Sequence, residues 1–250
     1  DEEVLARVDR GEFGLLIVNG TRWHGSAALH ELQATFGARL PPVALCDHED
    51  YPQLRVDFVE AFRPAVYFKR TTLLPPGHPN TYLLGRPDVL VRPLPFSSPW
   101  DVPWVPWGER EIDVFCVFGM TQVMRPKIRG RVLKLAEKHP QLKVVTAIGH
   151  KYPHKEYLGL LGRSRIVVDH QCRGADTVRT WEALAAGACV LSDVAIRQPA
   201  PLEPGKHYIQ YPRDTSKAGN KQNVGRFAEI LEATVANWQY AQWIARQGWD

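Results

Sequence analysis

Short apolar runs alternate with segments of helical periodicity along most of the chain. The runs have four to seven residues, a length typical of buried strands, and predict strands at residues 14–18, 42–45, 65–68, 89–92, 112–118, 143–148, 166–169 and 189–192. Segments with apolar residues every three or four positions predict helices at residues 27–36, 51–62, 127–138, 155–161 and 178–186, and a long closing helix at 223–247. Strands that alternate with helices predict an α/β fold with parallel sheets covered by helices.

The pattern changes between Pro75 and Pro106, where nine prolines occur, and three closely spaced tryptophans lie at positions 100, 104 and 107. Proline disfavours helix interiors and central strands, so this stretch is expected to be mostly irregular. We therefore expect two Rossmann-like lobes with a cleft between them. The N-terminal lobe takes residues 1–108, with 75–108 as loop and linker, and the C-terminal lobe takes residues 109–250 with the closing helix.

Composition and charge narrow the class of protein. The 250 residues are 44% apolar and 23% charged, which excludes collagen-like and largely disordered chains. No apolar run approaches the roughly 20 residues of a membrane span, and no signal peptide is visible, so a cytoplasmic protein is expected. Residues 1–110 carry 11 basic and 14 acidic residues, whereas 111–250 carry 20 and 13. The positive second half suits an anionic ligand such as a nucleotide diphosphate, or a nucleic acid.

Three predicted turns in the second half carry candidate binding residues. Ligands of parallel α/β sheets bind where strands end and helices begin. After the strand at 112–118, Arg125 and Lys127 flank Pro126, which suits a first helical turn. Positive side chains at a helix N-terminus favour a phosphate, although a solvated basic helix gives the same pattern.

The second turn, after residue 148, contains His150 and Tyr152. Either side chain suits stacking or hydrogen bonding to a base, and a plain solvated loop is the alternative. The third turn follows the strand at 166–169 and contains Arg173, Gly174, Asp176 and Thr177. Glycine permits close approach of a ligand to the backbone, and Asp176 or Thr177 suits a helix cap.

Arg179 and Glu182 follow on the helix at 178–186. They are three residues apart and share a helix face. A cation for a diphosphate and a carboxylate for ribose hydroxyls would hold a sugar nucleotide. An Arg–Glu ion pair within the helix is the structural alternative.

The run at residues 179–193 (RTWEALAAGACVLSD), with the segment at 201–211 (PLEPGKHYIQY), resembles the donor-binding lobe of GT-B glycosyltransferases. It is most similar to the spore-maturation CgeB-type and exostosin-like branches, and the resemblance extends over about residues 111–240. The resemblance implies that Glu182 contacts the donor ribose, that Arg179 binds a phosphate and that Arg125 lies at a phosphate-binding position. Many retaining members have a second glutamate eight residues before the one at Glu182, whereas this chain has Gly174 there.

The N-terminal lobe is expected to bind the acceptor and to supply a catalytic base. The candidates are His24, Asp47 and Asp50, which follow the predicted strands at 14–18 and 42–45, while Lys69 and Arg70 follow a third. Each is also an ordinary residue for a loop or a helix cap. No DxD element with a matching partner is present, so we expect no metal and no cofactor beyond the sugar nucleotide.

The leading hypothesis is a metal-independent glycosyltransferase, for hexosyl or pentosyl transfer from a nucleotide diphosphate sugar such as a UDP-sugar. The acceptor is open: a protein, a glycan, a small molecule or a modified DNA base. Two alternatives are kept. One is a nucleotide-sugar epimerase or hydrolase on the same fold, and the other is a non-catalytic nucleotide- or nucleic-acid-binding module.

Overall fold

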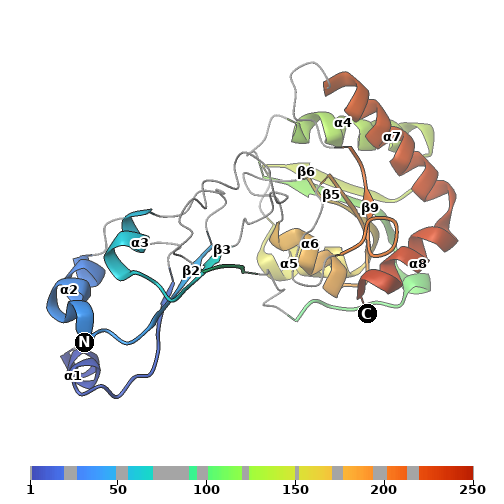
Figure 1. Ribbon diagram of the computed structural model, residues 1–250. Helices are drawn as coiled ribbons and strands as arrows, with labels where there is room; N and C mark the ends of the chain where they lie inside the picture. The colour runs from blue at the N-terminus through green and yellow to red at the C-terminus, as the bar shows by residue number, and fades with distance from the viewer. Residues whose placement is uncertain are drawn as a thin grey trace. The chain divides into compact units, whose positions relative to one another are not determined.

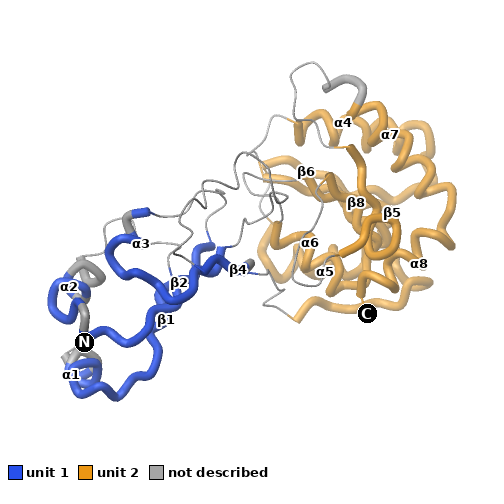
Figure 2. Tube along the Cα trace, in the orientation of Figure 1, with its two compact units in different colours: residues 1–95 blue, residues 96–250 orange. Residues whose placement is uncertain are grey.

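The chain folds into two compact units, residues 1–95 and residues 96–250 (Figure 2). The computed structural model describes residues 2–19, 27–48, 56–69, 90–94, 101–119, 124–149, 152–170, 177–193, 202–212 and 220–249. The sequence placed the domain boundary after residue 108. In the structure, the segment with Trp104 and Trp107 belongs to the second unit.

Unit 1 is built on a four-stranded parallel sheet with the order β1-β2-β3-β4 (Figure 1). Its strands are β1 (Leu16–Asn19), β2 (Val43–Asp47), β3 (Val66–Lys69) and β4 (Val91–Pro93). Its helices are α1 (Glu2–Asp9), α2 (Ala27–Phe36) and α3 (Val56–Phe62), with a 3-10 turn η1 (Gly37–Arg39). Apolar residues of β1, β2 and β3 form its core with Phe58, Val59 and Phe62 of α3.

Unit 2 is built on a five-stranded parallel sheet with the order β6-β5-β7-β8-β9. Its strands are β5 (Ile112–Phe118), β6 (Val144–Ile148), β7 (Ser164–Val168), β8 (Cys189–Ser192) and β9 (Ile209–Gln210). Its helices are α4 (Arg125–Lys138), α5 (His154–Gly162), α6 (Val178–Ala185), α7 (Asn220–Ala236) and α8 (Trp238–Trp249), and a 3-10 turn η3 (Trp107–Glu109) precedes β5.

Helices cover both faces of this second sheet, as Figure 1 shows. All seven residues of β5 are buried. Alternate residues of β5 pack against α4, α7 and α8 on one face and against α5 and α6 on the other. Burial on both faces explains why the central strands are continuous apolar runs rather than alternating ones. Cys116 and Cys189 are buried free thiols in these strands, as their apolar surroundings predict.

Most of the predicted elements are present, and the differences have local causes. The closing helical segment is divided at Asn237, whose side-chain oxygen accepts a hydrogen bond from the backbone N–H of Tyr240 and caps α8. The apolar pattern of the sequence did not predict α1, nor did it predict β9, because two residues are too few for a recognisable pattern. Among the described residues, no helix combines the length and the apolarity needed to cross a bilayer.

Candidate functional site

Polar residues gather at the carboxyl edge of the second sheet. Asp169 and His170 follow β7, Asp193 follows β8 and Tyr211 follows β9. Because all five strands are parallel, these residues lie at one edge of the sheet, where α/β proteins bind their ligands. His170 is 5% exposed and the other three are 1% exposed, so the edge is lined by buried polar groups.

The Asp169 carboxylate is the centre of this edge. It accepts hydrogen bonds from the hydroxyls of Thr177 (2.9 Å) and Thr180 (2.5 Å) and from Nη1 of Arg179 (2.9 Å). Thr177 is the N-cap residue of α6, as expected, but its side chain makes no capping hydrogen bond because its hydroxyl donates to Asp169. Asp169 therefore ties the start of α6 to the end of β7.

Two arginine guanidiniums lie near the Phe118 ring at the end of β5. The guanidinium carbons of Arg125 and Arg179 each lie 5.4 Å from the centre of the Phe118 ring. Arg125 is 4% exposed and donates to the carbonyl oxygens of Gly119 (3.1 Å) and His170 (3.0 Å). Nε of Arg179 is buried and has no hydrogen-bond partner among the described residues. The edge thus holds two guanidiniums, and the Nε–H of Arg179 has no acceptor among the described residues.

Glu182 lies one turn further along α6 and is 4% exposed. Burial raises its pKa above the ordinary 4.5, and the positive charges of His154 and Arg179 and a hydrogen bond from Tyr157 oppose this rise. Tyr157 also interacts with Arg179. Arg179 and Glu182, which were expected to share a helix face, are therefore linked through Tyr157 of α5.

His170, Asp193 and Tyr211 form a second cluster at the same edge. Nδ1 of His170 lies 3.2 Å from a carboxylate oxygen of Asp193 and 3.1 Å from the Tyr211 hydroxyl. That hydroxyl donates to the carbonyl oxygen of Asp169 over 2.7 Å. Burial raises the pKa of Tyr211 well above its ordinary value, so it acts as a neutral donor. The cluster fixes the ends of β7, β8 and β9 relative to one another.

Unit 1 has its own buried charges at the carboxyl edge of its sheet. Asp47 ends β2 and Lys69 ends β3, and the two are register partners. One Asp47 oxygen accepts hydrogen bonds from Nζ of Lys69 (2.7 Å) and from the Tyr67 hydroxyl (2.5 Å). Lys69 is fully buried and Asp47 is 1% exposed. This geometry gives Asp47 a structural ion pair, and its role as a base stays a prediction.

The structure brings some of the predicted site residues together and places others apart. Arg125, Thr177, Arg179 and Glu182 lie at the edge described above. Lys127 is exposed in the first turn of α4, and Tyr152 packs beside the apolar cluster of α5 and α6. The other candidates lie outside the described residues, namely His24, Asp50, His150, Arg173, Gly174 and Asp176.

Sequence reasoning missed Asp169, Phe118 and Tyr157. Asp169 had a usable signal, because it is an acidic residue directly after an apolar strand. Phe118 and Tyr157 read as ordinary core residues, and only their contacts with the arginines distinguish them. Within the described ranges, no group of three or more His, Cys, Asp or Glu side chains is arranged to hold a metal ion.

Comparison with known proteins shows similarity in structure only. The sequence matches no protein-family model and no curated protein. A structure of a GtfA/B complex matches with a TM-score of 0.56 and 10% identity over 99% of this chain and 58% of that one. A structure of TarM matches with a TM-score of 0.56 and 11% identity, over 94% of this chain and 50% of that one. A structure of Anabaena Alr3699/HepE in complex with UDP and glucose matches with a TM-score of 0.55 and 13% identity, over 99% of this chain and 76% of that one.

At these identities the likeness defines the fold. The chain spans 58% and 50% of the length of the first two proteins. Its two parallel sheets flanked by helices, with helices at the C-terminus, are those of the GT-B fold, so the predicted fold class is confirmed.

Proposed function

We propose that this chain is a glycosyltransferase of the GT-B type that takes a sugar from a nucleotide diphosphate donor, without a metal. Its fold is shared with an Anabaena protein whose structure holds UDP and glucose, so a UDP-sugar is the first donor to test. On the residues at 179–193, we place it with the CgeB-type and exostosin-like branches. The pair of guanidiniums over Phe118 is the observation that carries the proposal.

These guanidiniums suit a diphosphate because of their charge and their place at the carboxyl edge. Arg125 and Arg179 come from the first turns of α4 and α6, whose N-termini add positive dipole ends. The Nε–H of Arg179, which has no acceptor among the described residues, could donate to a phosphate oxygen. Glu182, on the same helix, would accept hydrogen bonds from the ribose hydroxyls.

In the reaction, an acceptor hydroxyl oxygen attacks the anomeric carbon of the donor. The bond from that carbon to the diphosphate oxygen breaks, and its electron pair leaves with the diphosphate, whose growing charge the two arginines stabilise. The acceptor proton passes to a base, for which unit 1 offers His24, Asp47 and Asp50. The acceptor class is to be identified by a transfer screen that offers a protein, a glycan, a small molecule and a modified DNA base.

Calorimetric titration with UDP, GDP, ADP, dTDP and CDP, with and without EDTA, tests the donor site. We expect one diphosphate to bind with an affinity that EDTA does not change. Lys127→Gln should weaken binding about threefold, because Lys127 is exposed in the first turn of α4. Lys134→Gln is the matched control, since Lys134 is exposed seven residues further along, about 10 Å from that turn.

Turnover is then followed with the sugar form of the diphosphate that binds. Release of free diphosphate with transfer to an acceptor supports the proposal. Binding of no diphosphate, together with salt-sensitive binding of a polynucleotide, would contradict it and indicate a nucleic-acid-binding module.

A further inference from the structure

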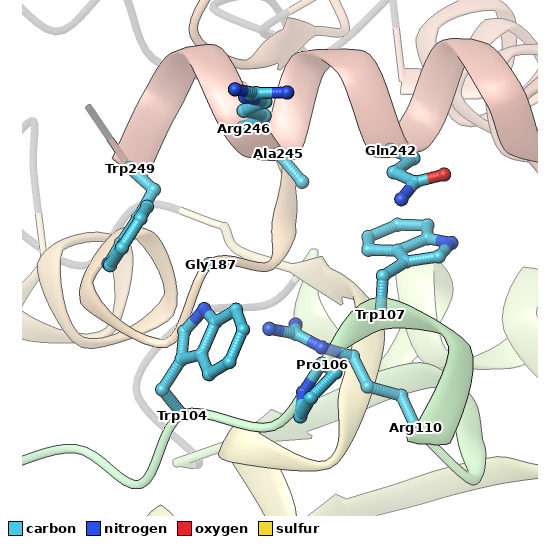
Figure 3. A pocket seen from close by; sticks show the side chains of 9 residues that line it. All are labelled: Trp104, Pro106, Trp107, Arg110, Gly187, Gln242, Ala245, Arg246 and Trp249. Atoms are coloured by element: carbon cyan, nitrogen blue, oxygen red, sulfur yellow. The ribbon is translucent and has the colours of Figure 1, made fainter.

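Unit 2 has a cavity at the edge of its sheet opposite the carboxyl edge. Three tryptophans, Trp104, Trp107 and Trp249, and two arginines, Arg110 and Arg246, contribute to its lining (Figure 3). Its volume is about 370 Å³, within the range of small-molecule sites. It lies at the amino edge because Arg110 precedes β5 and Gly187, also in the lining, precedes β8. The seven residues of β5 separate the two edges by about 20 Å.

The cavity presents aromatic walls to the solvent. Trp104 and Trp249 are stacked with ring centroids 5.9 Å apart, and each is 52% exposed. Trp107 lies on the other side of the Arg110 guanidinium from Trp104 in Figure 3. Large exposed aromatic side chains gathered at a cavity favour a flat ring as the occupant, since ring faces stack at low entropic cost.

Arg110 supplies a buried positive charge beside these walls. It is 2% exposed, and its guanidinium donates to the carbonyl oxygens of Val105 (2.9 Å), Ser164 (2.7 Å) and Ala186 (2.5 Å). No carboxylate of the described residues forms an ion pair with it. Burial, with a smaller effect from Arg165, lowers the pKa of Arg110 to about 10. A buried cation held only by neutral oxygens is stabilised when an anion arrives.

Two further residues shape the cavity for an anion. Gly187 has a φ of +65°, and a Cβ there would lie 3.1 Å from Nε1 of Trp104 and 3.2 Å from Nη2 of Arg110. Glycine therefore keeps these two side chains close together. Arg246 is exposed on α8 and adds a second positive charge, while none of the described residues that line the cavity is acidic.

We propose that this cavity is a second binding site, which takes an aromatic anion. The flat ring would lie against the tryptophans, and its carboxylate or phosphate would face Arg110 and Arg246. An uncharged apolar occupant, such as a leucine side chain of another protein, would leave the Arg110 charge without a counter-ion. Such an occupant therefore fits the cavity less well than an aromatic anion does. This site is separate from the proposed donor site and does not depend on it.

Indole N–H resonances of the full ¹⁵N-labelled chain provide the test. Trp104→Phe and Trp249→Phe assign the two resonances, and benzoate, phenyl phosphate and the neutral benzyl alcohol are titrated in turn. We expect saturable shifts of both resonances, with at least one anion binding at least tenfold more tightly than benzyl alcohol. The comparison of benzoate with phenyl phosphate decides between carboxylate and phosphate.

Arg246→Gln should weaken binding of the anion at least threefold, because it removes the exposed cation and leaves Arg110 in place. Arg226→Gln is the control, since Arg226 is an exposed arginine of α7 outside the cavity lining. Equal affinity for benzyl alcohol, linear shifts that never saturate, or equal effects of the two substitutions would each overturn the proposal. In these cases Arg110 has only its structural role of joining three backbone segments.

Discussion

At the scale of single residues, two buried carboxylates at the carboxyl edge of unit 2 each have hydrogen-bond donors and positive charge nearby. Asp169 accepts hydrogen bonds from two hydroxyls and a guanidinium. Glu182 accepts a hydrogen bond from Tyr157 and lies near the positive charge of Arg179. A buried ion pair adds little net stability compared with apolar residues, but removing one partner is costly because the other stays buried.

Asp169→Asn should lower the free energy of unfolding by about 3 kcal/mol, because it leaves the Arg179 guanidinium without its carboxylate. Urea denaturation followed by circular dichroism measures the change. Glu229→Gln is the matched control, since Glu229 pairs with Arg226 at an exposed site and its loss should cost less than 1 kcal/mol. Similar costs for the two substitutions would show that the Asp169 pair is not buried in solution.

Glu182 should make stability fall as pH rises. Its pKa in the folded chain is raised above 4.5, so the unfolded chain releases this proton at a lower pH than the folded chain does. Above about pH 4.5, the free energy of unfolding of the natural chain should therefore decrease relative to Glu182→Gln, until pH exceeds the raised pKa. Urea denaturation of both chains between pH 4 and pH 8 measures this difference, and a constant difference would contradict the assignment.

At the scale of elements, close packing of the segment at 101–110 against α5 depends on a small residue. Gly162 ends α5, and a Cβ there would lie 2.2 Å from the carbonyl oxygen of Pro103. At Gly159, in the same helix, a Cβ would meet nothing within 4 Å. The two glycines of α5 thus have different roles, although both read in the sequence as weak helix formers.

Gly162→Ala should therefore destabilise the chain by more than 1 kcal/mol, since Pro103 or α5 must move. Gly159→Ala should stabilise it by about 0.5–1 kcal/mol, because alanine has the higher helix propensity. Urea denaturation of the two variants and of the natural chain gives the change in the free energy of unfolding for each substitution. If both substitutions stabilise, residues 101–103 do not pack on α5.

At the scale of the whole molecule, the two units have separate cores. The core of unit 1 is formed by β1, β2, β3 and α3, and unit 2 has an apolar cluster on each face of its own sheet. All the described residues of the proposed donor edge belong to unit 2. Donor binding should then be a property of unit 2, whereas transfer should need both units.

A fragment of residues 96–250 should bind the diphosphate with an affinity within about threefold of the whole chain, and it should not transfer sugar. Calorimetry and a transfer assay, run on the fragment and the whole chain side by side, measure the two properties. A folded fragment that does not bind, beside a whole chain that does, would place an essential binding residue in unit 1.

The helices and strands of this protein, and its α/β fold class, could be predicted from the sequence. Apolar runs and helical periodicity arise because the chain buries apolar side chains at regular positions, so they predicted β5, α4, β8 and the parallel sheets. Arg125 and Arg179 were predicted from their places after strands and from the resemblance to GT-B glycosyltransferases. The hydrogen-bond partners of the buried charged side chains, in contrast, are known only from the tertiary structure. Arg110 donates hydrogen bonds to residues 54 and 76 positions away, and Asp169 accepts one from Arg179, ten positions away. Such contacts depend on how separate segments pack together, and this packing produces no repeating pattern of residues in the sequence.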